Sequence, residues 1–370
     1  QNRPFSPSVM VKRGAPVAPS STMRHLSVPR RETQQIIQQL KAGGDLPEGA
    51  RVQPDPTDSN RTLIPIKEVS TTELLSIYPV TEAEPPTRSP KTYHDHLSTF
   101  LSDSEIDSIE WPSRHEFIGD LVLIKLDTDQ RPFGKAIGKA MLMQHPRTRA
   151  VFEDRGVVGE FRVRDLHLLT VRDGFDSTTR TRVLESGQYL WTDPAKVYYS
   201  ARLSRERQGT LDCAKKLSET LKRPISVCDP YAGVGPSLAP LVKEPGLVSE
   251  LFASDLNPQA IELLRENIST ELATIECADA RLLHRRSELH GKFDLLLVNI
   301  PHVTLEHLPT LIPLLNDGGV VRGWVVVEDE NLEVATKILQ EIVGKAVEIE
   351  VRRSYSASAN LCRFESKLGL

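Results

Sequence analysis

From about residue 204 onward, short apolar runs alternate with segments whose apolar positions recur at helical spacing. Four of the runs are expected to be strands: residues 225–229, 251–255, 275–279 and 293–299. Residues 258–267 form the clearest helical segment, because Pro258 suits the first turn of a helix. The alternation predicts an α/β fold, a Rossmann-like domain in which helices cover both faces of a parallel sheet.

The chain before residue 204 follows a different pattern. Thr33 is a candidate cap for a helix over residues 34–41, and residues 62–67 have the composition of a strand. Further elements are expected after them: strands at residues 117–126, 157–163 and 189–197, and a helix at residues 134–142. Helices and strands without regular alternation are typical of an α+β module.

Prolines and changes of composition divide the chain into regions. Pro85, Pro86 and Pro90 lie within residues 82–91, which are the best candidate for a linker. Residues 1–22 mix Ser, Pro and basic residues without a helical period, which predicts disorder. We therefore expect a basic leader at 1–22, a small N-terminal domain at 23–80, a middle α+β domain at 92–203 and the Rossmann-like domain at 204–370.

Charge is distributed unevenly, although the net charge is only −4. Residues 1–31 hold six basic residues and no acid, which suits an organelle transit segment. The expected location is mitochondrial, with the cytoplasm or nucleus as the alternative. Residues 125–182 hold twelve Lys or Arg against eight Asp or Glu, which fits a basic face for nucleic acid or an ordinary solvated surface equally well.

Composition argues against several classes of protein. No apolar run approaches the roughly 20 residues needed to cross a bilayer, so a soluble protein is expected. The four cysteines form no C-x-x-C pair, which argues against a zinc site or a disulfide framework and favours reduced thiols.

The first candidate for a ligand site is the sequence Asp229-Pro-Tyr-Ala-Gly-Val-Gly-Pro236, after the first expected strand. Gly233 and Gly235 permit a sharp turn and a close approach of the backbone to a ligand. A Gly-x-Gly pair alone is a weak signal, and a structural turn is its commoner explanation.

Acidic residues at the next two strand ends strengthen the case for a ligand. Asp255 follows the glycines by about 20 residues, where a carboxylate accepts hydrogen bonds from both hydroxyls of a ribose. Asp279 ends the third run and is expected at the adenine edge of the same crevice. These strand ends predict a nucleotide-like cofactor and leave an NAD site open.

The fourth strand end, Asn299-Ile-Pro301, points to a different chemistry. It resembles the N-[LIFP]-P signature of methyltransferases that modify nitrogens of bases. In those enzymes the Asn carbonyl and neighbouring backbone acceptors orient the target nitrogen toward the methyl group. A strand-ending turn is the alternative explanation, and the three preceding strand ends make it less attractive.

Several motifs together resemble one family. They are Gly159-Glu-Phe-Arg-Val-Arg-Asp165, Ala195-Lys-Val-Tyr-Tyr-Ser-Ala-Arg-Leu203 followed by Glu206, the glycine turn, Asp255-Leu-Asn-Pro258 and Asn299-Ile-Pro301. From about Met23 to its end the chain is similar to the archaeal and eukaryotic type of tRNA (guanine-N1)-methyltransferase, which makes 1-methylguanosine at position 37.

The resemblance implies a class I methyltransferase domain that uses S-adenosyl-L-methionine, with tRNA as the partner. In that family a small N-terminal domain inspects the outer corner of the tRNA, and a middle domain helps to hold the anticodon arm. Catalytic roles fall on Arg162, Glu206 and Asn299, and contacts to the substrate on Arg162, Arg164 and Pro301. The cofactor would be held by Tyr198, Asp229, Tyr231, Gly233, Gly235, Asp255, Asp279 and Asn299.

The implied roles are chemically consistent. Guanine N1 bears a proton, so a carboxylate such as that of Glu206 must remove it as the methyl group is transferred. Loss of the proton places negative charge on O6, which a fixed guanidinium such as that of Arg162 stabilises. Asn299 would hold the edge of the base, and Tyr198 would stack near a nucleotide flipped out of its loop. For isolated residues, a surface salt bridge of Arg162 and a first-turn position of Glu206 would be the simpler explanations.

The sequence departs from the family pattern around the cofactor and base pocket. Ser237 stands where Phe is common, and Val320-Val-Arg-Gly-Trp-Val325 stands where an aromatic-rich segment is usual. Ser354-Tyr-Ser-Ala-Ser358 lacks the usual Ala-Pro after Ser-Tyr, and His302 is expected at the edge of the pocket.

Two other functions stay open at this point. A methyltransferase-fold RNA-binding factor, for example in the assembly of organellar ribosomes with ribosomal RNA as partner, would act by docking, which the basic leader and the departures favour. The related aminocarboxypropyl transferase of wybutosine synthesis uses the same cofactor to transfer a different group, and Asn299-Ile-Pro301 speaks against it. The expected protein is a monomeric enzyme without a membrane partner or a metal.

Overall fold

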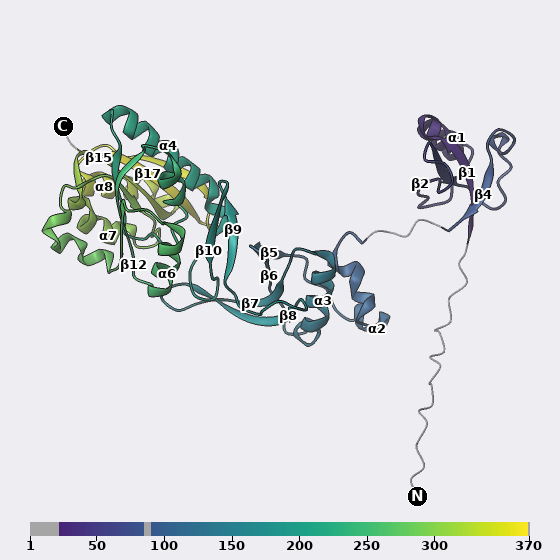
Figure 1. The fold of residues 1–370 in the computed structure, drawn as a ribbon, viewed down its shortest axis with the longest axis horizontal. Helices are drawn as coiled ribbons and strands as arrows, with labels where there is room; N and C mark the ends of the chain where they lie inside the picture. The colour runs from purple at the N-terminus through teal and green to yellow at the C-terminus, as the bar shows by residue number, and fades with distance from the viewer. Residues whose placement is uncertain (1–21, 85–89, 369–370) are drawn as a thin grey trace, which may run out of the picture. The chain divides into compact units, whose positions relative to one another are not determined.

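The computed structural model describes residues 22–84, 90–368 and no others, and the chain divides into two units between Pro90 and Lys91 (Figure 1). The expected leader at 1–22 lies outside the described residues except for its last position, as does the middle of the expected linker. No helix in the described ranges is both long and apolar enough to cross a membrane.

The first unit is a four-stranded antiparallel sheet with one α-helix. Its elements are β1 (Met23–Pro29), α1 (Thr33–Ala42), β2 (Gln53–Pro54), β3 (Arg61–Pro65) and β4 (Val80–Ala83), with the strand order β2-β3-β1-β4. Ile36 and Leu40 of α1 are buried with Leu26, Val28 and Ile64 of the sheet. The helix and strand predicted here are confirmed. The boundary expected at residue 80 falls on the first residue of β4, so the sheet extends beyond it.

The second unit begins with a four-stranded sheet in the order β5-β6-β7-β8. Its elements are α2 (Asp103–Ile106), β5 (His115–Ile118), β6 (Leu121–Ile124), α3 (Gly134–Gln144), β7 (Ala150–Val158) and β8 (Val163–Val171). Helix α3, predicted at 134–142, packs against the sheet at two glycines. A Cβ on Gly138 would lie 2.7 Å from Cγ2 of Thr170, so the missing side chain is what allows this close packing.

Two predicted strands of this region are wrong in the same way. Residues 117–126 and 157–163 each contain a hairpin turn, because Gly119 and Gly159 adopt φ values of +59° and +69°. The apolar pattern continues through each turn since both arms of a hairpin face the same core, and the pattern alone does not reveal the reversal. Residues 189–197 are also only partly a strand, which ends at Thr192 before Pro194.

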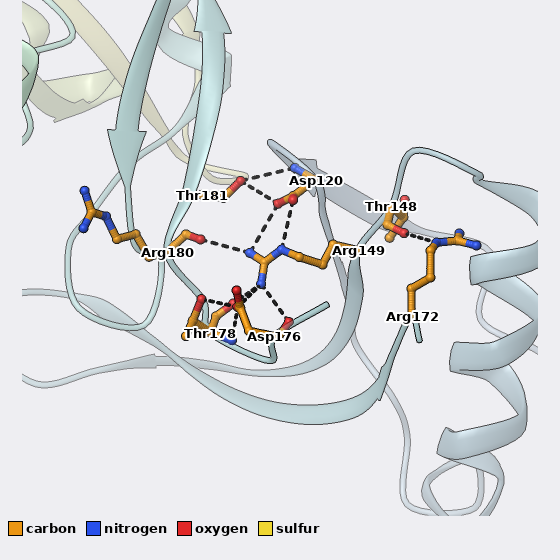
Figure 2. Close-up of polar contacts among 8 residues, drawn as sticks. All are labelled: Asp120, Thr148, Arg149, Arg172, Asp176, Thr178, Arg180 and Thr181. Atoms are coloured by element: carbon orange, nitrogen blue, oxygen red, sulfur yellow. Dashed lines mark hydrogen bonds and ion pairs between the residues drawn. The ribbon is translucent and has the colours of Figure 1, made fainter. Parts of the chain in front are cut away.

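A separate two-stranded hairpin, β9 (Thr181–Glu185) with β10 (Gln188–Thr192), follows the four-stranded sheet. Figure 2 shows how the buried Arg149 ties its start to the turn after β5. The guanidinium donates to both carboxylate oxygens of Asp120 at 2.9 and 3.4 Å, and to the backbone oxygen of Arg180 at 2.9 Å. It also donates to Asp176 Oδ1 at 2.6 Å. We call Arg149 and these partners the arginine clamp.

The C-terminal part of the unit is a seven-stranded sheet in the order β13-β12-β11-β14-β15-β17-β16. The strands are β11 (Ile225–Asp229), β12 (Val248–Asp255), β13 (Ala273–Cys277), β14 (Phe293–Val298), β15 (Leu315–Glu328), β16 (Glu348–Ser354) and β17 (Ala359–Lys367). The first five in the spatial order are parallel, and β17 and β16 form an antiparallel edge. The order reverses between β11 and β14, where α/β proteins bind ligands.

Helices cover both faces of this sheet, as predicted (Figure 1). They are α4 (Ser204–Leu221), α5 (Ala239–Lys243), α6 (Pro258–Asn267), α7 (Thr304–Leu311) and α8 (Leu332–Val343). Successive residues of β11 belong to different cores: Val227 is buried in the core that includes Leu264 of α6, and Cys228 in the core that includes Leu308 of α7. The Rossmann-like fold predicted from the alternation is therefore confirmed.

Candidate active site

The glycine turn after β11 leaves open space on its outer side. Gly233 and Gly235 adopt φ values of +53° and +82°, which residues with a side chain rarely adopt. A Cβ on Gly235 would lie 2.5 Å from Cδ1 of Leu264, so this glycine allows α6 to pack closely. A Cβ on Gly233 would meet nothing within 4 Å, and the backbone there is accessible to a ligand.

Asp255, the last residue of β12, is held at this turn by backbone donors. Its Oδ2 accepts from the N–H of Gly233 and its Oδ1 from the N–H of Asn257, both at 2.9 Å. The side chain of Asn257 in turn caps α6 by accepting from Gln259 N–H at 3.0 Å. Burial raises the pKa of Asp255, although these hydrogen bonds oppose the shift. The carboxylate is thus fixed at the edge of the open space.

Asp229 is the most deeply buried acid of the site. It ends β11, and its Oδ1 accepts from Tyr231 N–H at 3.2 Å. Burial, together with the nearby charge of Asp255, raises the pKa of Asp229 to about 7. No arginine or lysine of the described chain forms an ion pair with it, so a cationic ligand would favour its charged form.

Asp279 lies two residues beyond the end of β13, which finishes at Cys277. Its carboxylate caps the following turn, accepting from Arg281 N–H at 2.9 Å, and it pairs with the guanidinium of Arg281 at 2.6 Å. These contacts lower the pKa of Asp279. Nearby, the hydroxyl of Tyr231 lies 2.8 Å from Nδ1 of His307.

The residues around the glycine turn fit S-adenosylmethionine. Three carboxylates, those of Asp229, Asp255 and Asp279, follow three neighbouring strands, and the cofactor carries a cationic sulfonium and a ribose that carboxylates bind. Tyr198 is exposed on a loop whose position is fixed by a hydrogen bond of 2.8 Å from Asn257 Nδ2 to the oxygen of Lys196. This loop therefore lies beside the end of β12.

The turn at Asn299 follows β14 and is braced by the next strand. Pro301 accepts through its backbone oxygen from Val326 N–H at 2.8 Å, and Thr304 Oγ1 donates to the oxygen of Trp324 at 2.6 Å. The side chain of Asn299 is exposed and has no hydrogen-bond partner in the described part of the chain. Its amide is free to meet a base.

Glu206 lies in the first turn of α4, and its carboxylate is nearly buried against the sheet. Oε2 accepts from the indole N–H of Trp324 at 3.1 Å, and Oε1 from Arg352 Nε at 2.7 Å. Because Val298 pairs with Gly323, Trp324 of β15 lies beside the end of β14, after which Asn299 follows. Glu206 contacts this part of β15 through Trp324.

Arg162 belongs to the middle region. It lies in the turn between β7 and β8 with a φ of +52°, a strained conformation for a residue with a side chain, and its side chain is exposed. Its charge, after the larger effect of burial, helps to lower the pKa of His302, so Arg162 lies near the Asn299 turn. No carboxylate among the described residues pairs with Arg162.

Arg164 has a different environment from Arg162. Its Nη1 donates to Asp154 at 2.7 Å and its Nη2 to Glu116 at 2.8 Å. Both ends of the fork are therefore occupied within the middle region. The substrate contact that the resemblance implies for Arg164 stays a prediction, as do the other residue roles.

Sequence reasoning missed three side chains that the structure brings to the site. Trp324 and Arg352 hold Glu206, and the hydroxyl of Tyr355 lies 3.0 Å from Nε2 of His302. Trp324 and Tyr355 lie in segments that departed from the family pattern. No spacing rule connects them to Glu206, which is separated from Arg352 by 146 positions.

Comparison with known proteins agrees with this geometry. Residues 181–352 match the TRM5/TYW2 methyltransferase domain, and residues 93–174 match the TYW2 N-terminal domain. The crystal structure of Trm5b from Pyrococcus abyssi covers 94% of this chain and all of its own, with a TM-score of 0.66 and 26% identity. Together with the strand order and the glycine turn, these matches define an S-adenosylmethionine-dependent methyltransferase.

The family follows from the sequence relatives. The tRNA (guanine(37)-N(1))-methyltransferase Trm5b of Methanocaldococcus jannaschii is 30% identical over 268 residues, which are 71% of this chain and 74% of that protein. The Trm5b of Pyrococcus abyssi is 29% identical over 309 residues, 78% of this chain and 84% of that protein. The chain belongs to the tRNA (guanine(37)-N(1))-methyltransferase family, which confirms the predicted class of enzyme and its cofactor.

Proposed function

We propose that this chain transfers the methyl group of S-adenosylmethionine to N1 of guanosine 37 in tRNA. One observation carries the proposal: Glu206 accepts from Trp324, which lies in β15 beside the end of β14, and the free side chain of Asn299 follows that end. A base bound there has an acceptor for the N1 proton and a polar group for its edge. The names of the sequence relatives support guanosine 37 as the target.

In the proposed reaction, S-adenosylmethionine supplies an electrophilic methyl group on sulfur. The chain's own groups prepare the nucleophile. Glu206 takes the N1 proton, and the electron pair left on N1 forms the new N–C bond as the bond between sulfur and the methyl group breaks, its electron pair staying on sulfur. Arg162 would stabilise the negative charge that develops on O6: its charge reaches His302, which follows the Asn299 turn, and it has no carboxylate partner among the described residues.

The lowered pKa of Glu206 is consistent with a base that is charged at neutral pH. Burial acts in the opposite direction, but hydrogen bonds from Arg352 and Trp324 and the charges of Arg352 and Arg322 outweigh it. The carboxylate is therefore ready to accept a proton without first losing one.

We further propose that RNA contacts extend beyond this pocket. The middle region supplies Arg162 and contains the excess of basic residues at 125–182, which supports a role in holding the anticodon arm. The small N-terminal domain would inspect the outer corner of the tRNA, as the family resemblance implies. The structure of a complex of aTrm5 and tRNALeu shares the fold, with a TM-score of 0.67 at 23% identity.

The decisive experiment is methylation of a tRNA transcript with G37 by labelled cofactor, followed by identification of the modified nucleoside. The expected product is 1-methylguanosine, and a matched transcript with A37 should stay unlabelled. An aminocarboxypropyl product would instead support the wybutosine-pathway function. The match of residues 93–174 to the TYW2 N-terminal domain is the reason to test for this product. A protein that binds RNA without binding the cofactor in calorimetry would be a docking factor.

Two substitutions test the assigned roles. Glu206→Gln should lower kcat about 10²- to 10⁴-fold and Arg162→Ala about 10²- to 10³-fold, with cofactor affinity nearly unchanged. Glu219→Gln is the matched control, because Glu219 is an exposed acid of the same helix with no part in the site. Unchanged turnover in both test variants would refute the roles.

A further inference from the structure

Glu206 belongs to a ring of charged residues, closed through its own backbone oxygen, that the proposed reaction leaves unexplained. Its three cations and three anions come from one helix and three strands. The members of this charged ring are Glu206 of α4, Arg322 of β15, Glu350 and Arg352 of β16, and Arg363 and Glu365 of β17.

The ring meets Glu206 through Arg352. Nε of Arg352 donates to Glu206 Oε1 at 2.7 Å, and its Nη1 donates to Glu350. The side chains of Glu206 and Arg352 are only 11% and 27% exposed. At this depth the pair is shielded from salt and water far more than a surface ion pair is.

The other links continue around the ring. Glu350 accepts from Arg363 Nη2 at 2.5 Å, and Arg363 Nε lies 3.3 Å from Glu365 Oε1. Glu365 also pairs with Arg322, whose Nη2 lies 3.5 Å from the backbone oxygen of Glu206. Each carboxylate of the ring therefore contacts at least one arginine, and the path returns to the residue where it began.

We propose that Arg352 is a positioning residue for methyl transfer, which fixes the plane of the Glu206 carboxylate while the charged ring holds Arg352 in place. The proposal rests on the proposed function, in which Glu206 is the base. Arg352 Nε and Trp324 Nε1 donate to different oxygens of Glu206, so the carboxylate plane is defined by two fixed points. Each oxygen keeps a second lone pair with which to accept the guanine proton.

The ring explains why a long side chain stays in one place. A single arginine to carboxylate contact leaves several rotamers of the arginine accessible at small cost. Glu350 contacts Arg352 with one oxygen and Arg363 with the other, so it connects Arg352 to β17. A misplacement of a reacting group by about 1 Å can lower a rate about 10²-fold, which makes such bracing useful for a base.

The charges that face the Glu206 carboxylate come from β15 and β16. They are those of Arg322 and Arg352, and Trp324 of β15 adds a neutral donor. Burial raises the pKa of Glu206 and Arg352 lowers it, so this pKa should rise when Arg352 is removed. In the enzyme, the acidic limb of the kcat against pH profile should then move to higher pH, because the base stays protonated over a wider range.

The test compares Arg352→Gln and Arg352→Lys in the full chain with a G37 transcript. Arg352→Gln should lower kcat about 10- to 100-fold and move the acidic limb to higher pH, with little change in KM for either substrate. Arg352→Lys keeps the charge without the fork, so the limb should stay near that of the wild type while kcat falls. Glu350→Gln removes the carboxylate that links Arg352 to Arg363 but leaves Arg352 itself, so it should lower kcat less than Arg352→Gln does.

Arg286→Gln is the matched control. Arg286 also pairs with two glutamates, Glu276 at 2.6 Å and Glu288 at 2.8 Å, but lies beside β13 at the opposite edge of the sheet from β16. It should leave both kcat and the pH profile unchanged. If Arg352→Gln behaves like this control, Arg352 only stabilises the fold and the proposal is wrong.

A second readout does not need turnover. With Trp111 and Trp191 replaced by Phe, the emission of Trp324 reports protonation of the Glu206 carboxylate that it contacts. Arg352→Gln should raise the midpoint of this titration, measured at pH values where circular dichroism shows a folded chain. A raised midpoint in a chain that does not methylate tRNA would support the positioning role and refute the proposed function. An unmoved midpoint would refute the positioning role alone.

Discussion

Two buried arginines serve the second unit of this protein in opposite ways. Arg149 in the arginine clamp is surrounded by acceptors: the carboxylates of Asp120 and Asp176 and three backbone oxygens, as Figure 2 shows in part. Arg322 in the charged ring is 1% exposed and lies near a second cation, Arg363. Burial, with the charge of Arg363 adding to it, lowers the pKa of Arg322 to about 10.

The two environments indicate different roles: the arginine clamp serves structural stability and the charged ring serves catalysis. Every N–H group in the clamp has an acceptor, and Gly119 permits the contact, since a Cβ there would lie 2.1 Å from Thr181 Oγ1. The ring places like charges close together at a buried position, which is costly unless the arrangement serves another purpose. We expect substitutions in the clamp to act on the free energy of unfolding, and substitutions in the ring to act on kcat.

The largest effect is expected for Arg149→Met. It removes the donors for the backbone oxygens of Asp176, Thr178 and Arg180 and leaves Asp120 without its counter-ion. Water can solvate the carboxylates of Asp120 and Asp176, which are 41% and 68% exposed, so the main cost is the lost donor for three backbone oxygens. At roughly 1–3 kcal/mol for each unsatisfied group, urea unfolding should show a large decrease in the free energy of unfolding.

Arg149→Lys is the control, because it keeps the charge but has no fork, and its loss should be smaller. Below the unfolding transition, kcat of Arg149→Met should stay close to that of the wild type. A normal unfolding transition together with a large loss of kcat would contradict the separation of roles.

Neither arginine could be assigned from the sequence. The polar residues at the strand ends could be assigned, because the alternation of strands and helices predicts where β11, β12 and β14 end. A parallel sheet brings these ends to one edge. The alternation thus predicts Asp229, Asp255 and Asn299 at strand ends, where the structure has them, while their roles stay predictions. Asp279 was expected on a strand end and lies two residues beyond it, since the cap of the next turn begins there.

The partners of Glu206 were out of reach for a physical reason. Trp324 and Arg352 meet it only because β15 and the antiparallel β16 lie in the same sheet, at sequence separations of 118 and 146. Apolar periodicity determines which face of an element is buried, but it carries no information about which polar groups meet across elements. The hairpin turns at Gly119 and Gly159 were missed since their flanking strands share one apolar pattern.

A smaller effect is expected for Asp229, a buried carboxyl group that belongs neither to the arginine clamp nor to the charged ring. Its pKa is raised from 3.8 to about 7, so the native chain holds a proton that the unfolded chain has lost. Between these two values the contribution of Asp229 to stability therefore falls as pH rises. Asp229→Asn should remove this slope, which amounts to about 3–4 kcal/mol between pH 4 and pH 8.

The measurement is urea unfolding of both proteins without cofactor at pH 4.5, 6 and 8. The quantity to compare is the difference in the free energy of unfolding between wild type and variant at each pH, because the contributions of the other acids cancel in it. Asp279→Asn is a useful comparison, because the pKa of Asp279 is lowered by Arg281 and the sign of its pH dependence is opposite. Parallel curves for wild type and Asp229→Asn would show that Asp229 is charged despite its burial.

The smallest effect on stability, and the sharpest test of the comparison, is expected for Arg322→Met. Glu365 keeps a cationic neighbour when Arg322 is replaced, because Arg363 Nε still lies 3.3 Å from it. Asp120, by contrast, loses its counter-ion when Arg149 is replaced. A buried charge replaced by an apolar side chain of similar length is often neutral or stabilising, so the free energy of unfolding should change by less than about 1 kcal/mol. The ring is opened, however, and kcat should fall about 10-fold as Arg352 and Glu206 lose their bracing.

Thr210→Val separates the ring from the packing around it. This substitution removes the hydroxyl that lies 3.2 Å from Arg322 Nε but leaves every ion pair of the ring in place. It should therefore affect kcat much less than Arg322→Met does. If Arg322→Met instead unfolds the chain as severely as Arg149→Met, with kcat intact in the folded fraction, both arginines are structural and the charged ring has no part in placing Glu206.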